Sequence, residues 1–322
     1  NIAQGGLTEL LPDESYYWIY SNYFDWGFFD HPPLVALWIL ISDYFFSDEL
    51  GVRFFSAVSF SLMSYIVWLT IDHPRKNEYA WLFVLIYFST ALINVYGFIT
   101  TPDTPLMLFC ALFLFAYQQY LKSKSLLSYL LLTISISGMM YSKYQGLLII
   151  LFVVLSNWKL VKDYKLWLVC LFSLFIYVPY LHWQWINDFP SFRYHLEERV
   201  SYQSYKLEYT LTHFLNTLVI VGFTFPIIYK AFFKNISTKK KFSKSLNFII
   251  IGFFMFFFIA SFRGRVQAQW IVAISIPLIL ISFDYLIKDK NSRKWFIRLA
   301  FVNISLLFII RVLISNEEIL PV

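Results

Sequence analysis

The chain has 322 residues, of which 59% are hydrophobic and only 14% are charged, and its mean hydropathy is +0.60. Because a soluble core of this size does not need 36 Phe and 11 Trp, the composition excludes an ordinary soluble protein and predicts a membrane protein. The net charge of +6 sits mostly in loops between apolar segments, where Lys and Arg act as insertion signals, so we expect no nucleic-acid binding.

Residues 1–51 form the first predicted unit, an outer loop with two interfacial helices near 14–26 and 33–46. In these helices Tyr, Trp and Phe alternate with acids, as is typical of a segment that lies on a membrane. The unit carries Pro-Asp-Glu-Ser-Tyr-Tyr-Trp at 12–18 and Phe-Asp-His-Pro-Pro-Leu at 29–34. These motifs can hold a carboxylate at the water-lipid boundary, which makes the loop a candidate active site.

Ten apolar segments follow, and most approach the roughly 20 residues that a helix needs to cross the hydrocarbon layer. They cover 52–71, 79–97, 104–121, 125–141, 145–158, 166–182, 210–229, 245–262, 270–287 and 295–314. The sequence therefore predicts an all-α polytopic bundle of about ten transmembrane helices over residues 52–322.

The loops between these segments alternate between lysine-rich and acidic or polar ones, and the positive-inside rule assigns the two sets to opposite faces. The expected cytoplasmic set contains Arg75, Lys76, Lys122, Lys124, Lys159, Lys162, Lys165, Lys230 through Lys244, Lys288, Lys290, Arg293, Lys294 and Arg298. The expected outer set contains residues 1–51, Thr101-Pro102-Asp103, Lys143, the 183–209 loop and Arg263-Gly264-Arg265.

Acidic and cationic side chains from separate parts of the sequence are thus expected at one membrane face. They are Asp13, Glu14, Asp103, Lys143, Arg193, Arg263 and Arg265. A carboxylate base beside cations suits sugar transfer from a phosphate-bearing lipid, because the cations can stabilise the departing phosphate. Such a reaction requires neither the second carboxylic acid of glycoside hydrolysis nor a metal. A divalent metal is conceivable, but no ligand spacing supports one.

Five motifs in order resemble the bacterial branch of glycosyltransferase family 39, which includes protein O-mannosyltransferase-like enzymes and the aminoarabinose transferases that act on lipid A. Besides the two motifs in the first loop, they are Thr-Pro-Asp-Thr-Pro-Leu-Met-Leu-Phe at 101–109, Ser-Lys-Tyr-Gln-Gly-Leu-Leu at 142–148 and Trp-Gln-Trp-Ile-Asn-Asp-Phe-Pro-Ser-Phe at 183–192. The likeness runs from about residue 12 to about residue 195. Members of that family begin with a helix before the first outer loop, so the resemblance implies that a first helix is missing from this sequence.

The resemblance implies a GT-C fold and inverting transfer of a sugar from a polyprenyl-phosphate donor, at the periplasmic face of a bacterial inner membrane. By position, Asp13 would be the catalytic base, with Glu14 beside it and Asp103 as the second acid. Lys143 is the expected ligand of the lipid phosphate. Further candidates for substrate or phosphate binding are His31, Tyr17, Arg193, Arg263 and Arg265. The expected partners are the lipid donor, the bilayer and a lipid, glycan or protein acceptor.

Each residue also has a structural alternative. The acids at 13 and 103 could cap the helices that follow them, His31-Pro32-Pro33 could only set a turn, and the lysine and arginines could anchor helix ends at the interface. For the whole chain, the alternatives are a lipid-linked-sugar flippase or transporter and an inactive membrane subunit. The spans carry few charges at mid-membrane, which favours catalysis at the interface over transport.

Overall fold

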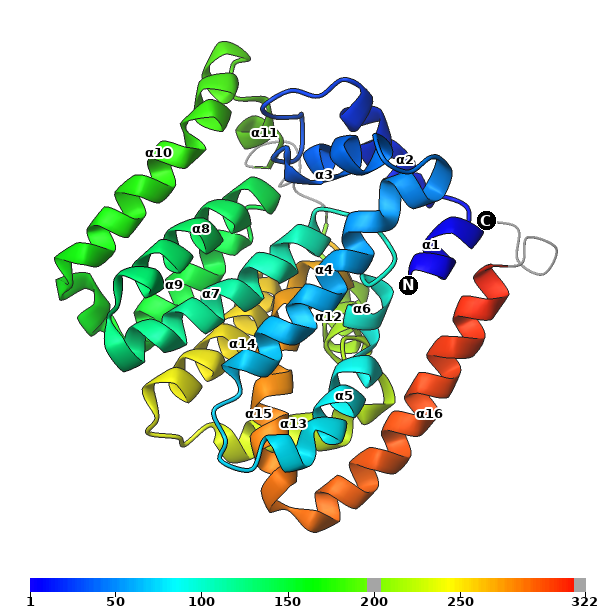
Figure 1. Ribbon diagram of the computed structural model, residues 1–322, viewed down its shortest axis with the longest axis vertical. Helices are drawn as coiled ribbons and strands as arrows, with labels where there is room; N and C mark the ends of the chain where they lie inside the picture. The colour runs from blue at the N-terminus through cyan, green and yellow to red at the C-terminus, as the bar shows by residue number, and fades with distance from the viewer. Residues whose placement is uncertain (196–203, 316–322) are drawn as a thin grey trace.

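The computed structural model describes residues 1–195 and 204–315, and all regular structure in these residues is helical (Figure 1), which confirms the all-α class. The α-helices are α1 (Ile2–Leu7), α2 (Pro12–Asn22), α3 (Leu34–Asp43), α4 (Asp48–Thr70), α5 (Ala80–Ser89), α6 (Ala91–Val95), α7 (Asp103–Ser123), α8 (Leu126–Ser142), α9 (Gly146–Ser156), α10 (Tyr164–Ile186), α11 (Pro190–Arg193), α12 (Leu207–Val219), α13 (Phe225–Asn235), α14 (Lys241–Ala260), α15 (Ser275–Lys288) and α16 (Lys290–Ile314). Short 3-10 helices are η1 (Asn77–Tyr79), η2 (Trp158–Lys162), η4 (Gly222–Thr224) and η5 (Ala268–Ile274).

Within the described residues, six helices are long and apolar enough to cross a membrane, or seven if one bent pair counts as a single span. The six are α4, α7, α10, α14, η5 with α15, and α16. The predicted number of about ten is therefore not confirmed. The other predicted spans are helical but short or broken: α8 has 17 residues, α9 has 11, and 79–97 is split into α5 and α6.

The seventh candidate is α12 followed by η4 and α13, which meet at an angle of 89°. Gly222 lies at this bend with a φ of +59°, a conformation that strains any residue with a Cβ atom. The side chain of Asn303 on α16 satisfies the backbone groups that the bend frees. It donates to Val221 O at 3.3 Å and accepts from Phe223 N at 3.3 Å, and it also donates to Ser89 O, at the end of α5, at 2.6 Å. Backbone breaks inside a membrane need such partners because no water is available there.

The bundle is organised around α7, most of which is buried between α4, α8 and η5. Two long helices, α10 and α16, lie at opposite edges of the bundle in Figure 1 and expose most of their surface. Their apolar outward faces suit contact with lipid.

The first helices of the chain gather at one end of the bundle. As predicted, helices form near 14–26 and 33–46, where α2 and α3 pack together beside the N-terminal end of α7 (Figure 1). The C-terminal end of α7 meets the lysine-rich loops, roughly 30 Å away for a helix of this length. The candidate site residues of the first loop and the lysine-rich loops therefore lie at opposite ends of the bundle.

Candidate functional site

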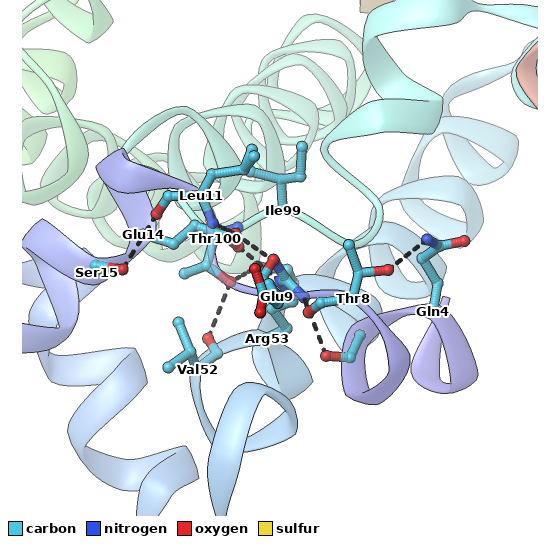
Figure 2. Close-up of polar contacts among 12 residues, drawn as sticks. Gln4, Thr8, Glu9, Leu11, Glu14, Ser15, Val52, Arg53, Ile99 and Thr100 are labelled. Atoms are coloured by element: carbon cyan, nitrogen blue, oxygen red, sulfur yellow. Dashed lines mark hydrogen bonds and ion pairs between the residues drawn. The ribbon is translucent and has the colours of Figure 1, made fainter. Parts of the chain in front are cut away.

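A buried ion pair between Glu14 and Arg53 fixes the start of α2 (Figure 2). Arg53 Nη2 lies 2.5 Å from Glu14 Oε2, and Arg53 Nε donates to Glu14 Oε1 at 2.9 Å. Glu14 also accepts hydrogen bonds from Leu11 N at 3.0 Å and from Thr100 N at 2.9 Å. Both charged side chains are 1% exposed or less. The bidentate geometry is the strongest that a guanidinium and a carboxylate can form.

The remaining protons of Arg53 go to backbone oxygens of the segment before α2, at Gly5, Thr8 and Glu9. Figure 2 shows how this one arginine joins that segment to α4, while Glu14 joins α2 to the loop before α7. Glu14 has no free surface with which to touch an acceptor. This geometry supports a positioning role for Glu14 and gives no support to the catalytic role expected of it.

Asp13, one residue earlier, has the opposite environment. Its side chain is exposed and makes no hydrogen bond or ion pair with the part of the chain that the structure describes. The capping alternative for Asp13 is wrong, because the carboxylate that accepts the Leu11 N–H belongs to Glu14. Asp13 lies in the first turn of α2, where the helix dipole favours a negative charge. It is a free carboxylate on a rigidly held helix end.

Asp103 and Lys143 form a second buried ion pair, which joins the start of α7 to the residue after α8. Lys143 Nζ lies 2.9 Å from Asp103 Oδ1 and 2.8 Å from Asp103 Oδ2, and the residues are only 6% and 3% exposed. The Asp103 carboxylate accepts from Lys143 rather than from a backbone N–H of α7, and the Asp103 N–H itself donates to Thr101 Oγ1 at 3.3 Å, so the capping alternative for Asp103 is also wrong. Two of the three ammonium protons of Lys143 are engaged, which leaves at most one for a substrate phosphate.

We expect Lys143→Met to lower the free energy of unfolding by about 2–3 kcal/mol, because it leaves the Asp103 carboxyl buried without its partner. The double variant Asp103→Asn/Lys143→Met should recover most of this loss, since the pair then carries no charge. Chemical unfolding in detergent, followed by tryptophan fluorescence, measures both values. A double variant as unstable as the sum of the two single variants would contradict a coupled pair.

Tyr17 lies among the acids of the site. The residue is buried at 7% exposure, and the edge of its ring packs on the His31 ring with centroids 5.7 Å apart. Burial, followed by the negative charges of Asp30, Asp103 and Asp13, holds the pKa of the Tyr17 hydroxyl well above its ordinary value. Three carboxylates from two segments thus act on one phenol, which stays protonated as a hydrogen-bond donor.

The Phe-Asp-His motif of the first loop forms a third polar cluster. His31 Nδ1 lies 2.9 Å from Asp30 Oδ2, and the hydroxyls of Tyr16 and Tyr20 each donate to Asp30 Oδ1 at 3.1 Å. Burial alone would raise the pKa of Asp30, but the hydrogen bonds and charge of His31, together with the two tyrosine hydroxyls, outweigh it and hold the pKa below its usual value. The ionised Asp30 thus lies directly beside the His31 ring, and the His31 backbone oxygen also closes the turn by accepting from Phe28 N at 3.2 Å.

The second outer segment docks onto the first. Trp183 Nε1 donates to Asp25 Oδ2 at 2.7 Å, Ser191 Oγ donates to Phe28 O at 2.5 Å, and a ring nitrogen of His195 lies 2.7 Å from Asp30 O. Gly27 lies directly against the Trp183 ring, where a Cβ atom would come within 2.4 Å. The described part of the 183–209 loop therefore covers the 25–31 segment. Glu197, Glu198 and Arg199 of this loop lie outside the described residues.

The arginines proposed from the sequence are less closely tied to the site. Arg193, Arg263 and Arg265 are exposed, and no contact joins them to the acids within residues 1–195 and 204–315. Among those same residues, no three His, Cys, Asp or Glu side chains converge as a metal ion would require. Metal independence stays a prediction.

Sequence reasoning missed three residues that shape the site: Arg53, Asp30 and His195. Arg53 falls at the start of a predicted span, where a cation is easily assigned to the membrane interface. Asp30 stands beside His31 in a motif that was recognised, and its neighbours Tyr16 and Tyr20 lie one helical turn apart. His195 carries no local signal, because its contact with Asp30 depends on the docking of the two outer segments.

Comparison with known proteins supports the resemblance seen in the motifs. The model of the family described as dolichyl-phosphate-mannose-protein mannosyltransferase matches residues 30–183, a little under half of the chain. This match includes His31, Asp103 and Lys143 but not Asp13. No curated protein matches the sequence.

Two solved structures share the fold. The crystal structure of ArnT from Cupriavidus metallidurans in the apo state matches with a TM-score of 0.74 and 16% identity, over 91% of this chain and 58% of that one. The same protein bound to undecaprenyl phosphate matches with a TM-score of 0.73 and 17% identity, over 89% of this chain and 58% of that one. The chain thus spans a little over half the length of these proteins. The predicted GT-C-like membrane fold is confirmed.

Proposed function

We propose that this protein is an inverting glycosyltransferase that moves a sugar from a polyprenyl-phosphate donor to an acceptor hydroxyl. One observation carries the proposal: Asp13 is a free carboxylate in the first turn of α2, whose start is held by the buried Glu14–Arg53 pair at the same end of the bundle as the Asp103–Lys143 pair. The fold shared with a protein that binds undecaprenyl phosphate supports the choice of donor. We place the site on the periplasmic face of a bacterial inner membrane, opposite the lysine-rich loops.

In this reaction Asp13 accepts the proton of the acceptor hydroxyl as its oxygen attacks the anomeric carbon. The bond between that carbon and the phosphate oxygen breaks on the opposite side, and its electron pair leaves with the polyprenyl phosphate. The configuration at the anomeric carbon is inverted. Because the departing phosphate monoester is a stable anion, no protonated carboxyl group is needed on its side.

The anion then needs positive charge and hydrogen-bond donors around it. We assign this role to His31, which lies beside Asp30. Lys143 would donate a hydrogen bond through its remaining ammonium proton, and Tyr17 would donate one through its hydroxyl. Arg193, Arg263 and Arg265 are exposed and suit long-range attraction of an anionic headgroup. The sugar and the acceptor, which can be a lipid, a glycan or a protein, are left open.

The test is transfer of a radiolabelled sugar by purified protein in proteoliposomes. We expect transfer from polyprenyl-phosphate sugars and none from nucleotide sugars, with activity retained in excess chelator. Liposomes without protein are the control. If no polyprenyl-phosphate sugar is turned over while the protein moves such a lipid between leaflets, the flippase alternative replaces this proposal. If the protein neither transfers the sugar nor moves the lipid, the inactive-subunit alternative replaces this proposal.

We expect the exposed arginines to affect binding of the donor more than turnover. Arg263→Gln/Arg265→Gln should raise KM for the lipid donor several-fold at low salt, with kcat unchanged, and the difference should shrink as salt screens the charges. Lys294→Gln/Arg298→Gln, at the opposite end of the bundle, is the matched control and should leave KM unchanged. A fall in kcat would instead indicate that the arginines contact the reacting phosphate.

A further inference from the structure

A pocket with a volume of about 190 Å³ lies between α7, α8, α9, η2 and α10, and its walls are almost entirely apolar. Most polar groups in the walls already have partners. Tyr120 OH donates to Asp163 Oδ2 at 2.8 Å, and Trp167 Nε1 donates to Val161 O at 2.9 Å. A cavity lined in this way offers little to water and favours an apolar occupant.

The pocket lies in the half of the bundle away from the candidate site. It is lined by the second half of α7, by η2, and by residues 166–170 at the start of α10. Three of its lining residues, Val161, Trp167 and Cys170, are exposed, and α10 is one of the two outermost helices in Figure 1. The pocket therefore opens toward the lipid-facing side of the bundle, at the end with the lysine-rich loops.

Positive charge borders this opening. Lys159 and Lys162 flank the lining residues Leu160 and Val161, are exposed, and have no ion-pair partner among the residues that the structure describes. The nearby acid, Asp163, is already occupied by Lys124 at 2.7 Å and by Tyr120. The unpaired lysines complement the charge of an anionic headgroup, and the apolar opening beside them complements the acyl chain attached to it.

We propose that this pocket holds part of one acyl chain of an anionic phospholipid from the leaflet next to the lysine-rich loops, with the headgroup on Lys159 and Lys162. The site is separate from the donor site, since it lies at the other end of α7. A zwitterionic lipid could fill the cavity but would gain little from the two lysines. The expected preference is for phosphatidylglycerol over phosphatidylcholine.

Cys170 reports directly on occupancy, because its thiol lines the pocket and is exposed, whereas Cys110 is fully buried. The measurement is the rate at which N-ethylmaleimide alkylates Cys170 in mixed micelles, by intact-protein mass spectrometry. At a phosphatidylglycerol concentration about ten times its dissociation constant, the rate should fall about tenfold. Phosphatidylcholine at the same concentration should slow it much less.

Matched variants separate the pocket from general lipid coating. Val154→Phe fills the cavity from α9 and should abolish protection by phosphatidylglycerol, whereas Leu151→Phe on the same helix does not line it and should not. Ile136→Phe fills it from α8 and serves if Val154→Phe does not fold. Unchanged protection in a folded pocket-filling variant would overturn the proposal.

The lysines are tested in the same assay. Lys159→Gln/Lys162→Gln should lower the preference for phosphatidylglycerol over phosphatidylcholine by roughly thirtyfold, while Lys239→Gln/Lys240→Gln, also exposed in a lysine-rich loop, should not. Equal protection by the two lipids in the unmutated protein would overturn the choice of an anionic lipid.

Discussion

Asp13→Asn should lower kcat for sugar transfer by about 10²–10⁴-fold, the usual contribution of a positioned general base. The substitution keeps the shape of the side chain but removes its ability to take a proton. Because the Asp13 side chain makes no hydrogen bond or ion pair with the described residues, the free energy of unfolding should fall by no more than about 1 kcal/mol, the value of its interaction with the helix dipole, and binding of the lipid donor should not change. A loss of rate with little change in stability and unchanged donor affinity distinguishes a base from a structural acid.

The matched control is Glu9→Gln, which removes an exposed carboxylate from the same segment and should leave the rate unchanged. Radiolabelled sugar transfer at saturating donor measures kcat, and binding of polyprenyl phosphate measures affinity. If Asp13→Asn transfers sugar at the full rate, the base lies elsewhere. Asp103 is then the next acid to test, although its oxygens are already engaged by Lys143.

Much of the fold followed from local patterns in the sequence. Apolar runs predicted where helices lie, and alternating charge separated the loops at the two ends of the bundle. The number of spans could not be predicted from the sequence. Hydropathy cannot detect a helix break whose free backbone groups are hydrogen-bonded by a side chain of another helix. The bend at Gly222 is tolerated because Asn303, 81 residues further along, bonds the backbone there. Nothing near residue 222 in the sequence signals this partner.

In the candidate site, too, the sequence predicted the residues but not their tertiary contacts. Asp13, Asp103, Lys143 and His31 were found from motifs, which record residue types and order. The motifs could not predict which of these residues form ion pairs, because Lys143 meets Asp103 only when α7 and α8 pack side by side. A lysine expected to be free for phosphate is largely occupied by a carboxylate, and Glu14, an acid expected to react, is buried in an ion pair with Arg53. Motifs located the candidate site, but only tertiary contacts show which of its residues are buried in ion pairs and which, like Asp13, are exposed.

Arg53→Met should have the largest effect on stability, lowering the free energy of unfolding by about 3–5 kcal/mol. It leaves the Glu14 carboxylate buried and unpaired and frees the backbone oxygens of Gly5, Thr8 and Glu9. Arg53→Lys should lose less, because an ammonium keeps the charge but not the bidentate contact. Arg298→Met, which removes an exposed arginine stacked on Trp295, is the control and should cost little.

The same variants test whether the pair positions Asp13. In Glu14→Gln/Arg53→Met the buried charges are gone together, so most of the stability should return. The start of α2 is then no longer tied to α4, and kcat should stay low while donor affinity is kept, because Asp13 is present but imprecisely placed. A double variant that recovers stability and full kcat would show that the pair serves folding alone. Recovery of kcat in Arg53→Lys, but not in Arg53→Met, would support positioning, since only a cation can hold Glu14 and, through it, the helix end that presents Asp13.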